Sequence, residues 1–466
     1  MNNSRHINRG AMQDRTVHRV EMPLQREQSR GGAGTISPSG QKLATLVFIL
    51  CLPFFAQVFH YLNELPPPYF LSKAWPILVL PFTLYAMVRL NLPGHNLFLV
   101  LLAYLLGFTP LISVMQLGNW FSDAMITTVK AWPYSYYFAL SGVLSLLALP
   151  ARRVRKIFLG FGLGTFILFV LLWVLVPASW YGSSPDEGKM LQYDVERGTR
   201  IYMATIFGMI YIFYLGRSFI ETRKVIYLIG LIAAFLILLF IYKQRAAIGA
   251  VFLVTVFGMV MSLPPRPRRF AMGAGVVVGV GVFVALMAKL GLFTAAGWAD
   301  LGERLGGSLS VRQNSSALAF SFLGTDVERW LFGVGATTRF GSVTLKDIFG
   351  YDQFFIADLG LLGTVFEYGL IGTLLILSVY VWAFLTINRN GRADKDRFQI
   401  VLGDYVLYLL LTSPIYPLVF LPGELGVVLA VAIYVHRCVT RQQEQEGRVV
   451  LPTSRVSLPW SRAKVS

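Results

Sequence analysis

An all-α, polytopic membrane fold is predicted by three observations. The 466 residues are 55% hydrophobic and only 14% charged, and their mean hydropathy is +0.60. Long apolar stretches recur along the chain, each close to the roughly 20 residues that one bilayer crossing requires. Basic residues gather in short segments between these stretches, as they do in the cytoplasmic loops of membrane proteins. This composition excludes a disordered chain and argues against a soluble enzyme or a nucleic-acid-binding module.

The first element is a polar N-terminal tail. Residues 1–42 contain seven Lys or Arg, three acidic residues and no continuous apolar run. A secretory signal peptide needs such a run, so we expect residues 1–42 to be a flexible cytoplasmic tail. Residues 437–466 are expected to form a second cytoplasmic tail, which leaves residues 43–436 as the transmembrane domain.

The transmembrane domain is expected to contain twelve spans, because twelve apolar segments have the length of a crossing or nearly so. They are residues 43–62, 70–88, 97–117, 130–149, 157–177, 201–216, 225–242, 246–263, 270–293, 361–386, 398–415 and 419–436.

The basic residues predict how these spans are oriented. An even number of crossings places both termini on one side, and the segments assigned to that side hold 28 of the 41 Lys and Arg residues. Cytoplasmic loops carry such an excess of positive charge. We therefore expect both termini to be cytoplasmic.

Two long loops are expected on the outer side, at residues 178–200 and 294–353. Both contain charges of either sign beside aromatic residues, and binding residues are common in such loops. Within the second loop, residues 311–322 are expected to form a surface helix, and Gly333-Val334-Gly335 a turn.

Two further polar or small-residue features lie within the predicted spans. The glycines between Gly273 and Gly281 are expected to form a face on which helices pack closely. Asp404 is expected to make a polar contact between helices, with a role in a proton path as the alternative.

Five basic residues on the outer side suggest an anion-binding site. Arg197 and Arg200 precede the sixth span, Lys243 and Arg245 lie in the short turn between the seventh and eighth spans, and Arg312 lies in the second long loop. A guanidinium group can hold phosphate oxygens at two points, so a lipid-linked diphosphate is the expected ligand. The alternative is that each side chain only anchors a helix end at the headgroups.

Three carboxylates lie near the outer end of the tenth span, at Asp352, Asp358 and Glu367. One of them could accept a proton during a glycosyl transfer that uses no metal ion. On one straight helix at 100° per residue they cannot all share a face, so at most two are expected in one site. Asp352 could instead cap the helix, and Glu367 could bind a neighbour in the bundle. The histidines and two cysteines have no metal-ligand spacing, so no metal site is predicted.

Several of these residues resemble the motifs of the O-antigen ligase and polymerase superfamily, the membrane enzymes called WaaL and Wzy. The resemblance covers the plan of twelve spans with a long periplasmic loop between the ninth and tenth. Arg200 resembles the arginine that enters a middle helix in these enzymes. The segment from Arg245 to Gly249 resembles their helix corner, and Arg312 followed by Phe332-Gly333-Val334-Gly335 resembles their loop arginine and turn.

A ligase pattern, His-(Asn/Ser)-x6-Gly-x2-(Gly/Thr/Tyr), is matched in spacing by Asp352-Gln353, Gly360 and Gly363. The histidine of that pattern is aspartate here, so the resemblance favours the polymerase branch. Residues 366–372 also resemble the tenth helix of the family.

The resemblance implies transfer of a saccharide from an undecaprenyl diphosphate carrier to a hydroxyl of another carrier-linked repeat. This transfer would occur at the periplasmic face of the bacterial inner membrane, without a metal ion or another cofactor, and would build O-antigen or exopolysaccharide. Arg245 and Arg312 would neutralise the departing diphosphate and Asp352 would orient or deprotonate the acceptor. Substrate would also be bound by Arg197, Arg200, Lys243 and Asp358.

The expected partners are the lipid-linked glycan and membrane lipid, with a chain-length regulator as a further candidate and no nucleic acid. Two alternatives stay open. The protein could be a ligase that attaches finished glycan to another acceptor, or a transporter or flippase of lipid-linked saccharide.

Overall fold

A computed structural model describes residues 38–59, 62, 65–182, 190–194, 198–289, 307–335, 337, 343, 345–349, 354, 356–419 and 421–449. The chain divides into two units, residues 1–44 and residues 45–466. The first unit contains, in its described part, only the start of helix α2. The second unit contains everything else discussed below.

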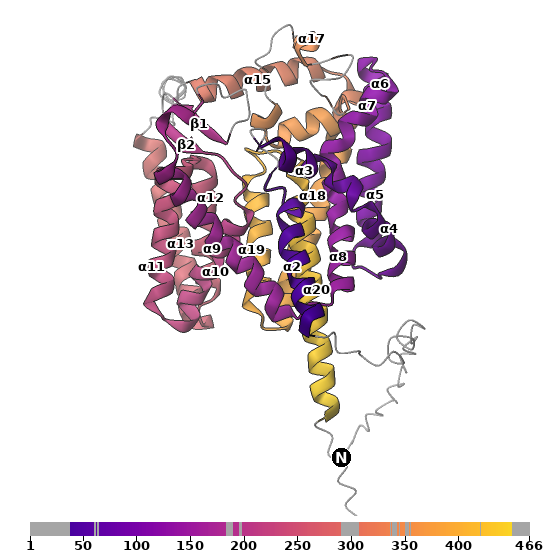
Figure 1. Ribbon diagram of the computed structural model, residues 1–466. Helices are drawn as coiled ribbons and strands as arrows, with labels where there is room; N and C mark the ends of the chain where they lie inside the picture. Colours follow the sequence, from indigo (N-terminus) through magenta and orange to yellow (C-terminus); the bar gives the residue numbers. More distant parts are fainter. Residues whose placement is uncertain are drawn as a thin grey trace, which may run out of the picture. The chain divides into compact units, whose positions relative to one another are not determined.

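Most of the described residues are helical, as the sequence predicts (Figure 1). The helices of the first half are α2 (Pro38–Phe55), α3 (Pro66–Leu78), α4 (Leu80–Arg89), α5 (His95–Leu102), η1 (Ala103–Phe108), α6 (Thr109–Leu117), α7 (Phe121–Thr127), η2 (Thr128–Ser135), α8 (Tyr136–Leu147), α9 (Ala151–Leu175), η3 (Ala178–Trp180) and α10 (Ile206–Thr222). Those of the second half are α11 (Val225–Ile237), η5 (Leu238–Tyr242), α12 (Arg245–Met261), α13 (Pro265–Lys289), α15 (Gly307–Leu323), α16 (Val327–Phe332), α17 (Leu345–Phe349), η6 (Ile356–Asp358), α18 (Leu361–Ala393), α19 (Arg397–Thr412) and α20 (Pro422–Val449).

Seven helical segments among the described residues are long and apolar enough to cross a membrane. They are Pro38–Phe55, Pro66–Arg89, His95–Leu117, Ala151–Leu175, Val225–Tyr242, Leu361–Ala393 and Pro422–Gln445, and Arg245–Met261 is a shorter apolar helix. Each of the twelve predicted spans overlaps a helix. The multi-pass helical fold is therefore supported, and the count of twelve crossings stays a prediction.

Several predicted span boundaries differ from the ends of the helices. The sixth span was expected to begin at residue 201, but Ile201 ends a short strand and α10 begins five residues later, at Ile206. Strand β2 (Gly198–Ile201) pairs antiparallel with β1 (Leu191–Asp194), so its backbone groups find partners in a hairpin and not in a helix. At the other end of the chain, α20 continues past the expected limit of 436 to Val449.

A helix is present where the sequence predicts one in the second long loop, and its place on the outer surface stays a prediction. Helix α15 covers residues 307–323, and its Ala319 and Leu323 are buried in a cluster with Phe354 and Phe366. In contrast, the glycines of α13 show no close packing. A Cβ atom built on Gly273, Gly275 or Gly281 would meet no described atom within 4 Å, so the expected packing face is open in the part of the chain that the structure describes.

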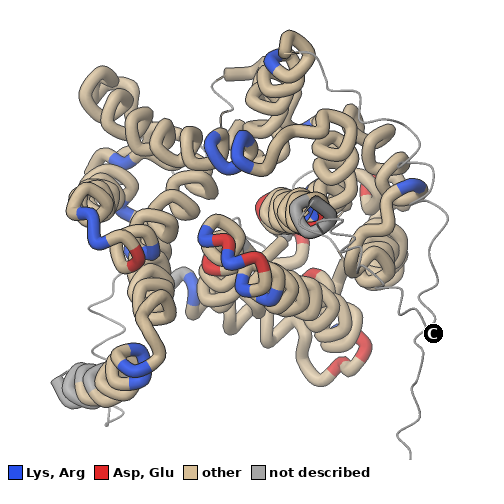
Figure 2. The backbone as a smooth tube through the Cα atoms, turned by 90° about the horizontal axis from the view of Figure 1, so that it is seen from below, with Lys and Arg blue, Asp and Glu red and all other residues tan. Residues whose placement is uncertain are grey.

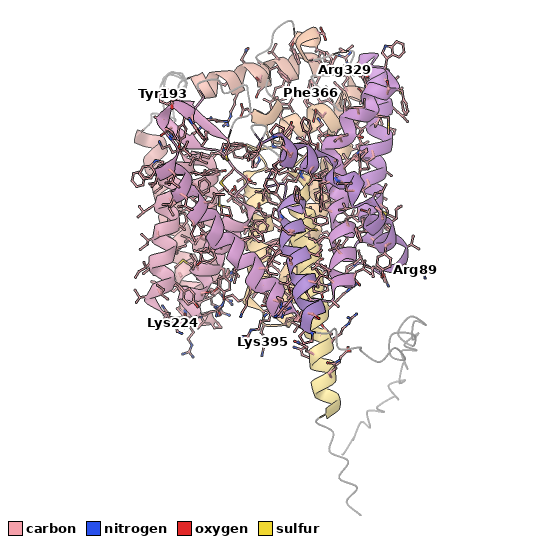
Figure 3. The ribbon with its side chains drawn as sticks, viewed as in Figure 1. Arg89, Tyr193, Lys224, Arg329, Phe366 and Lys395 are labelled. Atoms are coloured by element: carbon pink, nitrogen blue, oxygen red, sulfur yellow. The ribbon has the colours of Figure 1, made fainter. Side chains whose placement is uncertain are left out.

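Residues from the predicted inner and outer loops lie at two different ends of the helices. Arg89, Lys224 and Lys395 lie at one end of the helices, and Tyr193 and Arg329 lie at the opposite end (Figure 3). We call these the basic end and the hairpin end. Seen from the basic end, Lys and Arg occupy several separate helix ends (Figure 2). The first three residues come from predicted inner loops and the other two from predicted outer loops.

Ion pairs connect the helices toward the basic end. Asp404 of α19 accepts two hydrogen bonds from Arg217 of α10, at 2.5 Å and 2.7 Å, and both side chains are buried. The predicted contact of Asp404 with another helix is thus confirmed. Next to it, Arg397 binds the Glu221 carboxylate and donates to the Ser218 hydroxyl at 2.9 Å. These contacts fix α10 against α19.

Close backbone approaches pack the remaining helices. A Cβ on Gly142 of α8 would lie 2.7 Å from the Phe82 carbonyl oxygen of α4. On another side of α8, a Cβ on Gly426 of α20 would lie 2.9 Å from the Tyr137 amide nitrogen. Inside a membrane the hydrophobic effect does not drive helices together, so helices associate through close packing. Small residues such as these glycines allow that close packing. Helices α4, α8 and α20 therefore form one tightly packed layer.

Candidate functional site

The corner between α11 and α12 is tight, as predicted. Helical turn η5 ends at Tyr242 and α12 begins at Arg245. Lys243 turns the chain with a left-handed backbone, at φ 56°, and its N–H donates to the Leu238 carbonyl at 2.9 Å. Two residues thus reverse the chain, which fixes where the side chains on either side of the turn point.

A largely apolar groove lies between α11 and α12 and reaches this corner. Its volume is about 880 Å³. Lys243 and Arg245 line it at the corner, and most of the other lining side chains are Leu231, Ile232, Phe235, Leu236, Leu239, Ile248, Phe252, Val256 and Met259. The groove therefore offers an apolar wall with two cationic side chains at one end.

Arg245 is exposed at that end. Among the described residues its guanidinium group has no hydrogen-bond or ion-pair partner. A guanidinium group without an internal partner keeps its donors available for a bound anion. Gly249, one turn further along α12, also lines the groove, and a Cβ built there would meet nothing within 4 Å. Gly249 thus leaves space in the groove and does not pack against a neighbouring backbone.

Lys243 joins the corner to the β-hairpin. Its ammonium group donates to the Thr199 carbonyl at 2.7 Å. Thr199 precedes Arg200 in β2, and Arg200 is registered against Gln192 of β1. The structure therefore brings three of the predicted cations, Arg200, Lys243 and Arg245, to one region.

The corner and the hairpin lie at the end predicted to face outward. Helix α11 begins one residue after Lys224, which lies at the basic end (Figure 3). The 18 residues of Val225–Tyr242 span about 27 Å at 1.5 Å per residue. The corner that follows them therefore lies toward the hairpin end, with Tyr193 of strand β1.

Arg312 belongs to a second group. Its guanidinium lies 3.5 Å from the Asp358 carboxylate, and both side chains are partly exposed. Two of the predicted site residues are therefore partners of each other. The cluster that includes Ala319 and Phe366 holds α15 against the start of α18 and so positions this pair. No hydrogen bond or ion pair between described residues connects Arg312 to Arg245.

Asp352 and Arg197 lie outside the described residues. Asp358 and Glu367, the two of the three carboxylates that the structure describes, do not lie on one helix. Asp358 lies in the turn η6, α18 begins only at Leu361, and Glu367 is on the first part of α18.

Glu367 contacts neighbours in the bundle, which is one of the two expected outcomes. Its carboxylate forms an ion pair with Lys130 and accepts a hydrogen bond from the Thr337 hydroxyl at 3.0 Å. Only 3% of Glu367 is exposed. Helix α18 is broken two residues later, at Gly369, where φ is 65° and ψ is −179°.

The segment Gly333-Val334-Gly335 closes this break. The Val334 N–H donates to the Phe366 carbonyl at 2.9 Å, and the Gly335 N–H donates to the Glu367 carbonyl at 3.0 Å. A turn was predicted at these glycines, and both have positive φ. Backbone groups released by a broken helix need such partners, so the segment from Gly333 to Gly335 supports the interrupted helix.

A second cavity, of about 250 Å³, lies on the other side of the corner. Tyr242, Gln244 and Ala247 line it, so the residues of the corner alternate between the groove and this cavity. Its remaining polar wall contains Tyr202, Thr205, Tyr380, Tyr405, Tyr408, Thr412, Tyr416 and Glu424. We call it the tyrosine cavity.

The sequence prediction missed Glu424. It lies in the first turn of α20, is only 3% exposed, and accepts a hydrogen bond from the Tyr405 hydroxyl at 2.7 Å. A signal was present, because an acidic residue inside an apolar span is costly and is commonly functional.

In the part of the chain that the structure describes, no three His, Cys, Asp or Glu residues gather closely enough to hold a metal ion.

The corner, the apolar groove and the tyrosine cavity together form the candidate site. Comparison with known proteins adds nothing to this geometry, since no protein-family model and no curated protein matches the chain.

Proposed function

We propose that this protein is a membrane glycosyltransferase that uses a saccharide linked to a polyprenyl diphosphate as its donor. The observation that carries the proposal is the groove between α11 and α12, which is apolar along its walls and cationic at the corner. A polyprenyl diphosphate has the same division, with a long apolar chain and a compact anionic head.

The apolar walls suit the lipid tail. Moving hydrocarbon out of water contributes about 0.8 kcal/mol per CH₂ group. A lipid tail that moves from the bilayer into the groove is already out of water, so it gains less binding free energy. The groove therefore supplies shape and alignment more than affinity. Its lining on α12 runs from Arg245 to Met259, about 21 Å at 1.5 Å per residue, which accommodates several prenyl units.

The corner suits the diphosphate. Arg245 is exposed at the groove and has no described partner, and Lys243 lies next to it. As the sugar–phosphate bond breaks, negative charge grows on the leaving oxygen, and a cation held in place beside it lowers the barrier. In this proposal Arg245 carries that role, and Lys243 and Arg200 hold the rest of the diphosphate.

Other predicted residues have supporting roles in the proposal. Arg312 binds the glycan or a phosphate after it leaves Asp358, and Arg197 adds positive charge near Arg200. Asp352 orients or deprotonates the acceptor hydroxyl. The reaction is polymerisation of lipid-linked repeats at the outer face of a bacterial inner membrane, and analysis of the acceptor distinguishes this from a ligase.

The test measures transfer by the purified protein in liposomes that contain lipid-linked oligosaccharide. Arg245→Ala should lower the rate of transfer by about 100-fold, which is the effect of removing one preorganised donor from a transition state. Arg245→Lys should retain part of the wild-type rate. Lys224→Ala is the matched control, because Lys224 is exposed at the basic end (Figure 3). An unchanged rate in Arg245→Ala would remove the leaving-group role.

The same liposomes separate the enzyme from a transporter. With the substrate on one face only, an enzyme forms longer glycans on that face. Movement of labelled lipid to the other face without new glycosidic bonds would identify a flippase and contradict the proposal.

A further inference from the structure

The tyrosine cavity contains a buried carboxylate with an unused oxygen. One oxygen of Glu424 accepts from Tyr405, and its other oxygen has no hydrogen-bond partner among the described residues. No described cation forms an ion pair with it. Buried polar groups need hydrogen-bond partners, and the second oxygen of Glu424 is therefore open to a ligand that donates hydrogen bonds.

The walls of the cavity have the chemistry that binds a sugar ring. Six of the lining residues are tyrosines, namely Tyr202, Tyr242, Tyr380, Tyr405, Tyr408 and Tyr416. Tyrosine rings offer an apolar face to C–H groups, and their hydroxyls donate or accept hydrogen bonds. A carboxylate among them accepts hydrogen bonds from two hydroxyls at once. An apolar ligand would leave the second oxygen of Glu424 without a hydrogen bond.

The size of the cavity selects a small ligand. Sites for drug-sized molecules have volumes of about 300 to 1,000 Å³, and the tyrosine cavity has about 250 Å³. This volume suits one sugar ring and excludes a long oligosaccharide.

The position of the cavity places such a ring beside the proposed diphosphate site. Helix α19 begins two residues after Lys395, at the basic end, and runs for 16 residues to Thr412 (Figure 3). Glu424 follows in the first turn of α20, so it lies toward the hairpin end, as Lys243 and Arg245 do. Gln244 lines the cavity between these two cations of the groove, and its amide oxygen accepts from the Tyr242 hydroxyl at 2.6 Å.

We infer that the tyrosine cavity is a saccharide subsite, which binds the sugar attached directly to the diphosphate and in which Glu424 accepts hydrogen bonds from its hydroxyls. The inference rests on the proposed function, because it uses the corner as the diphosphate site. Tyr405 is a positioning residue, since its hydroxyl holds one oxygen of Glu424 and leaves the other for the sugar.

The test compares binding of undecaprenyl diphosphate with that of the same lipid carrying N-acetylglucosamine, glucose or galactose. Full-length protein in nanodiscs is titrated with each lipid. At least one glycosylated lipid should bind the wild-type protein about tenfold more tightly than the bare diphosphate, the contribution of hydrogen bonds to one charged group. Glu424→Gln should remove this preference, so that the glycosylated lipids and the bare diphosphate bind with similar affinity.

Two further variants keep the test decisive. Glu444→Gln is the matched control, because Glu444 is exposed on the same helix, and it should retain the preference. Tyr405→Phe should weaken the preference even where Glu424→Gln fails to fold. If no sugar improves binding over the bare diphosphate, or if Glu424→Gln keeps the preference, the saccharide subsite is refuted. Failure of every polyprenyl diphosphate to bind would instead refute the proposed function.

Discussion

Gly333 and Gly369 lie so close together that a Cβ atom on Gly333 would come within 2.5 Å of the Gly369 amide nitrogen. The two glycines are 36 positions apart in the sequence. Gly369 breaks α18, and the segment that begins at Gly333 supplies hydrogen bonds to the carbonyls on the N-terminal side of the break. The interrupted helix and the segment from Gly333 to Gly335 are therefore one structural unit.

Replacement of Gly333 by alanine should destabilise this unit. Gly333 has φ 75°, which strains any residue with a Cβ atom, and the new methyl group would meet the backbone of Glu367 and Gly369. We expect a loss of about 2 kcal/mol or more in the free energy of unfolding, measured as a lower Tm in detergent. Gly273→Ala is the control: it lies in α13 with open space around it and should leave Tm unchanged or raise it. Equal Tm values for Gly333→Ala and the wild type would contradict this account of the break.

The ion pair between Lys130 and Glu367 should hold the same loop. Glu367 also accepts hydrogen bonds from Thr337, at 3.3 Å from its N–H and 3.0 Å from its hydroxyl. Glu367→Ala should therefore speed amide hydrogen exchange in residues 333–337, because the local opening becomes easier. Glu328→Ala, an exposed acid in α16, is the control. Unchanged exchange in Glu367→Ala would mean that the main-chain hydrogen bonds alone hold the segment.

Arg217 and Asp404 should depend on each other for stability. Both are buried and share two hydrogen bonds, so removing one leaves an uncompensated buried charge that costs about 3 to 5 kcal/mol. Asp404→Leu and Arg217→Met should each lower stability strongly, and the double variant should lower it by less than the sum. A double-mutant cycle on unfolding in detergent measures this difference. Additive effects would show that the pair is not coupled.

The pair of Arg312 and Asp358 should contribute little to stability. Its side chains are 33% and 41% exposed and 3.5 Å apart, and exposed pairs are worth about 0 to 1 kcal/mol. Asp358→Asn should thus leave Tm nearly unchanged, whereas Arg312→Ala should reduce glycosyl transfer if Arg312 binds substrate. Normal transfer by Arg312→Ala in correctly inserted protein would assign this arginine to anchoring only.

The predicted orientation can be tested with single cysteines. The two native cysteines, Cys51 and Cys438, are first replaced by alanine. Cysteines at Arg89, Lys224 and Lys395 should react with a membrane-impermeant maleimide only after the cytoplasmic side is exposed. Cysteines at Tyr193 and Arg329 should react in intact spheroplasts, because they lie at the opposite end (Figure 3). The reverse pattern would place the groove's cationic corner in the cytoplasm and overturn the proposed site.

The sequence by itself determined the class of fold and the grouping of its loops. Apolar length and the positions of basic residues are local properties, and a membrane requires helical segments whose backbone groups are satisfied internally. The same local signals predicted the corner at Lys243, the surface helix α15 and the turn at Gly333. They misplaced the start of α10, because strand pairing with Leu191–Asp194 depends on a partner outside the segment.

Only the tertiary structure decided which residues meet. No pattern in the sequence predicts that Arg312 pairs with Asp358, 46 positions away, or Lys130 with Glu367, 237 positions away. The sequence analysis also did not select Glu424, which is a single acidic residue in an apolar span. Its role as part of a cavity lined by six tyrosines is visible only in the folded structure. The charge and hydrogen-bonding capacity of each residue follow from its side chain. The distances between residues depend on how the helices pack, and contacts between segments far apart in the chain determine that packing.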